Sequence, residues 1–392
     1  MNYELTPKPH YHVLDGLRGV AAMMVIVYHI FECFDYSPLP HGNLAVDFFF
    51  VLSGFVIGYA YDDRWKKGLT TGQFIRRRLI RLHPMVVVGV LFGVAAFLLA
   101  GSQRWDGSHV DIGWVMVAMV CALFMIPIVP GTQSDVRGFT EMFPLNGPCW
   151  SLFFEYIGNL LYALLLHRLP TKVLALIATA CGVILTWSAL QRGYIDQGWS
   201  LAEGGFWGGM VRMLFPYTIG MLMARCFKPL KVKGTFWKCS LVVLIIGAVP
   251  ILGGEDTIWM NGVYCAVCVV VIFPAIVWIA ASEPMVEMHA WHPCRVLGDI
   301  SYPLYASHYP FMYLFYAFIG FHGDLVPIAK LGETWPAATA ILIGCPLLAL
   351  ALYHFYDMPV RKRLNEGTKR KNDDELFAAL ISKQPRKCLT KF

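Results

Sequence analysis

Apolar runs long enough to cross a membrane recur along this whole chain, and they constrain its fold more than any other feature. The runs lie at about residues 13–34, 44–61, 79–100, 112–130, 148–166, 171–190, 206–224, 239–253, 258–281, 298–319 and 336–356. A helix needs about 20 apolar residues to cross a hydrocarbon core of about 30 Å. Backbone polar groups inside lipid must be satisfied within the segment, which favours helices. We therefore predict an all-α fold, a polytopic transmembrane helix bundle.

Loop charge predicts how the bundle is oriented. Basic residues gather in short loops such as 64–81, 225–238 and 361–371, which the positive-inside rule places in the cytosol. The same rule accounts for the formal charge of +6 without a nucleic-acid partner. If successive runs cross the membrane in alternating directions, these loop positions require one crossing where the chain has two runs, 112–130 and 148–166. Pro127 and Pro130 end helices. We therefore expect about ten full spans, with 112–130 as one partial or re-entrant helix beside a cavity.

Composition and cysteine spacing limit the domain organisation and the chemistry. We expect residues 1–366 to form one integral membrane domain and residues 367–392 a polar cytosolic tail, so that both termini are cytosolic. The first run begins near Val13, contains Arg18 and reads as a permanent span rather than a cleavable signal. Cys265 and Cys268 are C-x-x-C spaced, but no second pair or His cluster accompanies them. We expect no metal site.

Two ionisable residues inside the first run, Arg18 and His29, are the first candidates for chemistry. Eleven residues at 100° each bring both side chains to one helix face, about 16 Å apart along the axis. Asp15 precedes Arg18 by one turn. Ionisable groups within a span usually face the bundle interior, and a neutral imidazole can take a proton from a hydroxyl. In the structural alternative, Arg18 reaches the cytosolic interface and His29 bonds a backbone carbonyl.

A basic cluster follows the second run. Arg77 and Arg78 share a helix face with Arg81, because residues three and four apart are neighbours on a helix. Converging guanidinium groups suit phosphates, such as the diphosphate and 3′-phosphate of coenzyme A. The alternative is a topology signal or a contact with anionic lipid.

A polar stripe marks the run that begins near Trp150. Ser151, Glu155 and Asn159 recur every four residues on an otherwise apolar helix. A carboxylate there needs a partner, for which His29 and an Arg are the candidates, and we predict that Glu155 orients the His29 imidazole, as the acid of a hydrolase triad does. A structural hydrogen bond between helices is the alternative.

Further polar candidates lie in the second and the tenth runs. Asp47 is expected near the outer end of its helix, close to His29, and Ser53 follows in the same run. Tyr302 and His308 lie in the tenth run, where His308 is a second intramembrane histidine that could contact an acceptor or the catalytic centre. Helix capping and structural roles are the alternatives.

Six motifs, in this order, resemble those of the acyltransferase-3 family of membrane acyltransferases. They are Leu14-Asp15-Gly16-Leu17-Arg18-Gly19 leading to His29, Asp47-Phe48-Phe49-Phe50-Val51-Leu52-Ser53-Gly54-Phe55, Arg78-Leu79-Ile80-Arg81, Trp150-Ser151-Leu152 with Glu155, Ser301-Tyr302-Pro303-Leu304-Tyr305 with His308, and Asp357-Met358-Pro359-Val360-Arg361. In the last motif Asp replaces the family's Glu. The resemblance covers about residues 12–363.

The resemblance implies an enzyme, a membrane O-acyltransferase that moves an acyl group, expected to be acetyl, from cytosolic acyl-CoA. Acyl-CoA is then a donor substrate rather than a permanently bound cofactor. The acceptor is a hydroxyl of a glycan or of another envelope or exported molecule, and the location a bacterial plasma membrane. The site residues are His29, Glu155 and Arg18 for catalysis, Arg77, Arg78 and Arg81 for the donor, and Asp15, Asp47, Ser53, Trp150, Ser151, Tyr302 and His308 in support. Some relatives carry an extra esterase-like domain, and we expect none in the short stretch after residue 366.

Two other functions remain open at this point. A polytopic transporter or flippase for a polar or lipid-linked substrate would also use intramembrane Arg, His and Glu residues. A scaffold subunit would leave those residues unexplained. Within the acyltransferase hypothesis, direct transfer and an acyl-histidine intermediate are both compatible with the sequence, as are many acceptors, acyl chain lengths and oligomeric states.

Overall fold

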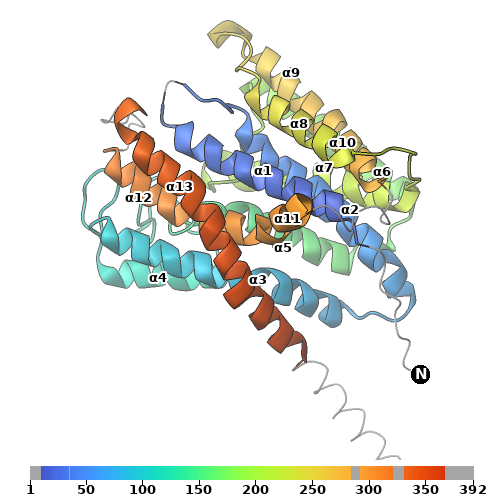
Figure 1. Ribbon diagram of the computed structural model, residues 1–392, viewed down its shortest axis with the longest axis horizontal. Helices are drawn as coiled ribbons and strands as arrows, with labels where there is room; N and C mark the ends of the chain where they lie inside the picture. Colours follow the sequence, from blue (N-terminus) through green and yellow to red (C-terminus); the bar gives the residue numbers. More distant parts are fainter. Residues whose placement is uncertain (1–9, 35, 284–291, 321–330, 367–392) are drawn as a thin grey trace, which may run out of the picture.

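The computed structural model describes residues 10–34, 36–283, 292–320 and 331–366, and within these ranges every regular element is a helix (Figure 1). The α-helices are α1 (His12–Phe31), α2 (Ala45–Lys66), α3 (Thr71–Leu99), α4 (Ile112–Leu123), α5 (Cys149–Leu164), α6 (Thr171–Arg192), α7 (Gly205–Cys226), α8 (Thr235–Ala248), α9 (Trp259–Val267), α10 (Phe273–Ala281), α11 (His292–Ser307), α12 (Tyr309–Phe318) and α13 (Leu331–Leu352). Short 3-10 turns are η1 (Gly42–Leu44), η2 (Leu166–Arg168), η3 (Ala202–Gly204) and η4 (Glu255–Thr257), and π-helical turns are η5 (Cys268–Ile272) and η7 (Tyr353–Asp357). The predicted tail 367–392 lies outside the described residues.

Six helical segments of the described residues are long and apolar enough to cross a membrane. They are His12–Phe31, Gly42–Lys66, Thr71–Leu99, Thr171–Arg192, Trp259–Ala281 and Gly332–Glu366. The protein is therefore integral to a membrane and all-helical over its described residues, as predicted, but the expected count of about ten full spans is not confirmed. One reason is length, because α8 has 14 residues and reaches only about 21 Å along its axis.

The run 112–130 forms a partial helix, as the sequence predicts. Helix α4 ends at Leu123 after 12 residues, which is about 18 Å of helix. It lies along α3 in Figure 1. The cavity described below is lined by residues of the loop that follows α4 and not by α4 itself, so the predicted position of this helix beside a cavity stays a prediction.

Close helix crossings form the centre of the bundle, where α1 packs on α11 and α2 on α7. A Cβ atom at Gly54 of α2 would lie 2.0 Å from the Tyr217 carbonyl oxygen of α7. A Cβ atom at Gly19 of α1 would lie 2.3 Å from the Leu297 carbonyl oxygen of α11. Small residues at such positions let membrane helices approach until their backbones touch. The second of these contacts fixes α1, the helix that carries Arg18 and His29, against α11.

Two interruptions in the later helices place polar residues. The run 298–319 is broken at His308, which separates α11 from α12. Helix α13 passes into the π-helical turn η7, which holds Asp357 in the protein interior. π-Helical turns are often found at functional sites.

The loop 125–148 between α4 and α5 is held by its own side chains. The Asp135 carboxylate accepts hydrogen bonds from backbone N–H groups of the loop, including those of Gly138 and Thr140. Arg137 is buried, and its guanidinium carbon lies 3.7 Å from the ring centroid of Tyr313 in α12. These contacts therefore hold the loop in one conformation and pack it against α12.

Candidate active site

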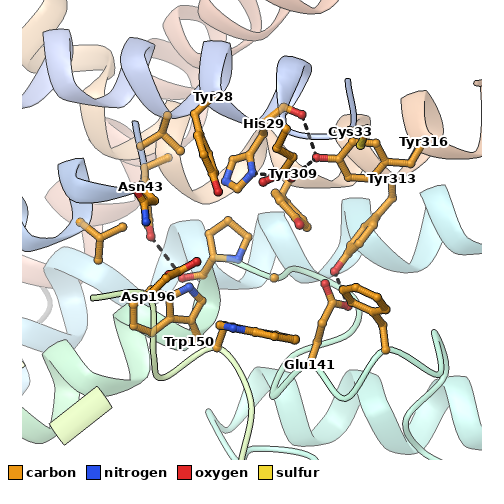
Figure 2. Close-up of a pocket in the computed structure, with 18 of the residues that line it drawn as sticks. Tyr28, His29, Cys33, Asn43, Glu141, Trp150, Asp196, Tyr309, Tyr313 and Tyr316 are labelled. Atoms are coloured by element: carbon orange, nitrogen blue, oxygen red, sulfur yellow. Dashed lines mark hydrogen bonds and ion pairs between the residues drawn. The ribbon is translucent and has the colours of Figure 1, made fainter. Parts of the chain in front are cut away.

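A cavity of about 370 Å³ lies at the end of α1 that carries His29 (Figure 2). Its wall comes from the helices α1, α2, α5, α7, α11 and α12, from the turn η1, and from residues of the segments 32–33, 100–111, 125–148 and 193–201. The lining residues are Val25, Tyr28, His29, Glu32, Cys33, Asn43, Val46, Trp105, Phe139, Glu141, Gly147, Pro148, Trp150, Asp196, Trp199, Arg212, Tyr305, Tyr309, Tyr313 and Tyr316. Aromatic rings and carboxylates predominate in this set.

His29 is held by a carboxylate one turn further along the chain. Its Nδ1 atom lies 2.9 Å from Oε1 of Glu32. The Tyr316 hydroxyl donates to the same carboxylate oxygen at 2.5 Å and to the His29 carbonyl oxygen at 2.9 Å. Because an ionised carboxylate only accepts hydrogen bonds, this contact assigns the proton to Nδ1 and leaves Nε2 as the acceptor. His29 thus has the tautomer that a general base requires.

A second histidine, His308, stacks on His29. The ring centroids are 5.7 Å apart and the planes differ by 28°. Nδ1 of His308 faces the carbonyl oxygens of Leu304 and Tyr305 at 3.1 and 3.0 Å, so it is the donor. Nε2 is buried and has no hydrogen-bond partner among the described residues. His308 therefore lies next to His29, one of the two positions that the sequence analysis left open for it.

The predicted contact between Glu155 and His29 is wrong. Glu155 accepts a hydrogen bond from Arg78 at 2.8 Å, an ion pair between α5 and α3. Ser53 of α2 donates to the same oxygen at 2.9 Å. A permanently charged guanidinium is a stronger partner for a half-buried carboxylate than a neutral imidazole. The acid that holds His29 is Glu32.

Arg18 lies towards the opposite end of α1 from the cavity. Its NH2 atom pairs with Asp15 at 3.1 Å, and its Nε donates to the Ser301 hydroxyl of α11 at 2.9 Å. The prediction that Asp15 joins Arg18 is therefore confirmed. Helical geometry places Arg18 about 16 Å from His29 along α1.

The three arginines of α3 that the sequence analysis assigned to the donor differ in their surroundings. Arg77 is exposed, whereas Arg78 turns inward to the ion pair just described, with its Nε buried and unpartnered among the described residues. Arg81 is partly buried, within electrostatic range of Arg18 and Asp357, and forms no hydrogen bond with another described residue. Arg18 and Arg81 therefore gather at one place, and Arg77 stays apart from them.

Asp47 is buried beside the cavity in an ion triad with Arg212 and Asp196. Nε and NH2 of Arg212 donate to the two Asp47 oxygens at 3.0 and 2.9 Å. NH1 donates to Asp196 at 2.8 Å. The other two N–H groups reach backbone carbonyl oxygens at 3.2 Å. All five guanidinium donors are thus used, and the Arg212 side chain lies over the Trp150 ring at 5.0 Å.

Two other predicted site residues, Ser151 and Tyr302, are not among the residues that line the cavity. The hydroxyl oxygen of Ser151 is 2.6 Å from that of Tyr305, a lining residue. The Tyr302 hydroxyl donates to the Leu82 carbonyl oxygen of α3. Both hydroxyls hold helices together around the site, whereas the predicted Trp150 lines the cavity itself.

Glu141 is a buried acid in the loop 125–148. Burial raises the pKa of its carboxyl to about 7, although Arg137 and a hydrogen bond from the Tyr313 hydroxyl (2.9 Å) act to lower it. Asp135 and Glu32 raise that pKa further. Glu141 is therefore part neutral and part ionised near neutral pH.

Four charged lining residues were missed by the sequence reasoning, namely Glu32, Glu141, Asp196 and Arg212. Arg212 carried a usable signal, because it is an ionisable residue within an apolar run. Glu32 stands three residues after His29, the spacing at which helix neighbours meet. Glu141 and Asp196 lie in loops and carried no signal of that kind. Within the described ranges, no group of three His, Cys, Asp or Glu residues could hold a metal ion.

Comparison with known proteins places this geometry in a family. A family model described as an acyltransferase domain matches residues 11–354. Protein 2 in picA locus of Rhizobium radiobacter is 34% identical over 193 residues, which are 47% of this chain and 98% of that protein. Acyltransferase MdmB of Streptomyces mycarofaciens is 26% identical over 371 residues, 86% of this chain and 87% of that protein.

The O-acetyltransferase OatA of Staphylococcus aureus (strain NCTC 8325 / PS 47) is 23% identical over 375 residues, which are 89% of this chain. The match covers 57% of that protein, so the chain spans little more than half of its length. No solved structure matches the chain.

Proposed function

The chain belongs to the acyltransferase domain family, and from this premise we propose that it is a membrane O-acyltransferase using acyl-CoA, with acetyl as the expected group. The acceptor is a hydroxyl of a glycan or of another envelope or exported molecule. Relatives that carry the names acyltransferase and O-acetyltransferase support the reaction class. The observation that carries the proposal is the His29–Glu32 pair at the wall of the cavity.

His29 is the general base in this reaction. With its Nδ1 proton held by Glu32, the Nε2 lone pair takes the proton of the acceptor hydroxyl. Glu32 stabilises the imidazolium that forms and keeps the ring in place. The second bond to Glu32, from Tyr316, fixes the carboxylate in turn.

The acyl donor reaches the site from the end of the bundle where Arg18 and Arg81 gather. Arg81 has guanidinium donors without partners among the described residues, as a phosphate site requires. The about 16 Å between Arg18 and His29 suits an extended pantetheine arm. The ion pair of Arg78 with Glu155 holds α3 against α5 beside this route.

The proposed step is an acyl substitution with its atoms in balance. The acceptor oxygen bonds to the thioester carbonyl carbon while its proton passes to Nε2 of His29. The carbon–sulfur bond then breaks, and the leaving thiolate takes that proton from the imidazolium. The acyl-histidine route has the same overall balance, with Nε2 as the first nucleophile and the acceptor hydroxyl as the second.

In the proposed orientation the chain sits in a bacterial plasma membrane with both termini in the cytosol, and the His29 cavity lies towards the outside. The transporter hypothesis gains nothing from the family comparison, which names acyltransferases.

The test uses membranes that lack the native gene and contain either the wild type or His29→Ala at equal abundance. Labelled acetyl-CoA is added, and alkali-labile label is counted in the glycan, lipid and small-molecule fractions. Label with the wild type alone is expected, and the labelled fraction identifies the acceptor class. Equal label from both proteins would remove His29 from the reaction.

A further inference from the structure

We propose that the cavity beside His29 binds a hydroxylated sugar ring that is neutral or amine-bearing, and that it rejects acceptors with an anionic group near the reacting hydroxyl. This inference rests on the proposed acyl transfer and specifies its acceptor. The charge, the hydrogen-bonding capacity and the aromatic surface of the cavity all favour such an acceptor.

Among the described residues that line the cavity, no cationic side chain is free to pair with an anionic group of an acceptor. Arg212 is the one guanidinium in the described wall, and all five of its N–H groups already bond to protein oxygens. His29 is held by Glu32. A carboxylate, phosphate or sulfate on the acceptor would therefore lose its hydration without gaining a charged partner, which is costly.

Negative charge is in excess around the cavity. Glu32, Glu141 and Asp196 line it, whereas the charge of Arg212 is shared between Asp196 and the buried Asp47. Arg137 lies behind the wall and offsets part of the charge of Glu141, and Asp135 in the same loop adds a further negative charge. With His29 neutral, carboxylates outnumber guanidinium groups, so the field inside the cavity repels anions and attracts cations.

Two carboxylates keep an oxygen for the acceptor. The Tyr313 hydroxyl bonds to Oε2 of Glu141, and Arg212 bonds to Oδ1 of Asp196. The second carboxylate oxygen of Glu141 and that of Asp196 form no hydrogen bond with a described residue. Both oxygens are accessible from the cavity. Such oxygens accept hydrogen bonds from sugar hydroxyls or from an ammonium group.

Aromatic side chains supply the remaining surface. Trp150 and Trp199 come from α5 and the loop 193–201, and Tyr309 and Tyr313 from α12. Figure 2 shows Trp150 across the cavity from His29, with Tyr309 and Tyr313 between them and to one side. The negative face of an aromatic ring attracts polarised C–H groups and cations alike. The cavity volume, about 370 Å³, falls within the range of small-molecule sites.

The experiment uses the full chain in lipid vesicles with labelled acetyl-CoA and three matched acceptors, the methyl β-glycosides of glucose, glucosamine and glucuronic acid. Alkali-labile O-acetyl product is measured for each. When one charge is removed or added about 7 Å from the charged group of the acceptor, kcat/KM changes by about tenfold after allowance for solvent screening. We expect kcat/KM for the glucoside and the glucosaminide to exceed that for the glucuronide by at least about tenfold.

Two variants test the origin of the discrimination, Glu141→Gln and Asp196→Asn. Each should raise glucuronide use relative to glucoside use by about tenfold. Asp106→Asn is the matched control, because Asp106 is an exposed acid next to the lining residue Trp105 but does not line the cavity. Its ratio should equal that of the wild type.

Equal use of the glucuronide and the glucoside by the wild type would overturn the inference, whatever the variants do. Transfer to native membrane acceptors without transfer to the glucoside or the glucosaminide would also overturn it, while leaving the proposed acyl transfer intact. No consumption of acetyl-CoA with any acceptor would refute the proposed function itself, and with it the basis for an acceptor site.

Discussion

Glu32→Gln is the substitution that tests the arrangement of the site most sharply. It keeps the size of the side chain and a hydrogen-bonding oxygen near Nδ1 of His29 but removes the negative charge. An amide stabilises the imidazolium less than a carboxylate does, and it can also turn its NH₂ towards the ring and favour the wrong tautomer. Turnover should therefore fall, while donor binding at the other end of α1 should not change.

The size of the effect follows from the geometry. With charge centres about 4 Å apart, an imidazolium and a carboxylate attract by about 4 kcal/mol at an effective dielectric constant of about 20. The side chains of His29 and Glu32 are 18% and 26% exposed, so solvent screens part of this attraction. Halving the figure leaves about 2 kcal/mol, which corresponds to a decrease in kcat of roughly 30-fold.

The assay measures release of the CoA thiol and formation of alkali-labile acetyl ester, at saturating acetyl-CoA and at varied acetyl-CoA. Glu32→Gln should lower kcat and leave the KM for acetyl-CoA within about twofold. Glu32→Asp, which retains the charge, should recover part of the lost kcat. Glu155→Gln is the contrasting variant, because Glu155 pairs with Arg78 and not with His29.

The reasoning is refuted if Glu32→Gln turns over at more than about half the wild-type rate. It is also refuted if Glu32→Gln and Glu32→Asp are equally impaired, because a charge effect requires them to differ. An effect on KM alone would assign Glu32 to substrate binding.

Three further predictions concern other parts of the chain. Arg81→Ala should raise the KM for acetyl-CoA by about tenfold through loss of a charged phosphate contact, whereas the exposed Arg77→Ala should leave it near the wild-type value, as steady-state kinetics will show. Asp47→Asn should lower the free energy of unfolding by about 3 kcal/mol, because it leaves the buried Arg212 with one carboxylate partner, and thermal denaturation in detergent measures the loss. Glu141, whose pKa burial raises to about 7, loses its proton as the pH rises from about 6 to 8, so preference for the methyl glucoside over the glucuronide should grow over that interval and stay flat in Glu141→Gln.

The sequence predicts the architecture well where hydrophobic length and motif order carry the information. The positions of the helices followed from the apolar runs, and the truncation of α4 followed from Pro127 and Pro130. The break at His308 did not follow, because the run 298–319 is apolar on both sides of it. The number of full spans also did not follow, because run length alone does not say whether a helix crosses.

The sequence predicted which residues belong to the candidate site better than it predicted which of them are in contact. His29, Trp150 and His308 meet at one end of α1, and Arg18 and Asp15 pair at the other, but helix spacing suggested only the second of these groupings. The partner of His29 was assigned to Glu155, since an acid deep in a span is the more conspicuous candidate. Pairing depends on which helix faces touch, and a single sequence does not determine which those are.

The most direct test of the account is acyl transfer by the purified chain in lipid vesicles, with wild type and His29→Ala side by side. Thiol release from acetyl-CoA and acetyl ester on an added hydroxyl acceptor are measured in the same tube. The account predicts equal molar amounts of thiol and ester with the wild type and neither above background with His29→Ala. Ester formation by His29→Ala at the wild-type rate would contradict it, and so would acceptor movement across the vesicle membrane without thiol release.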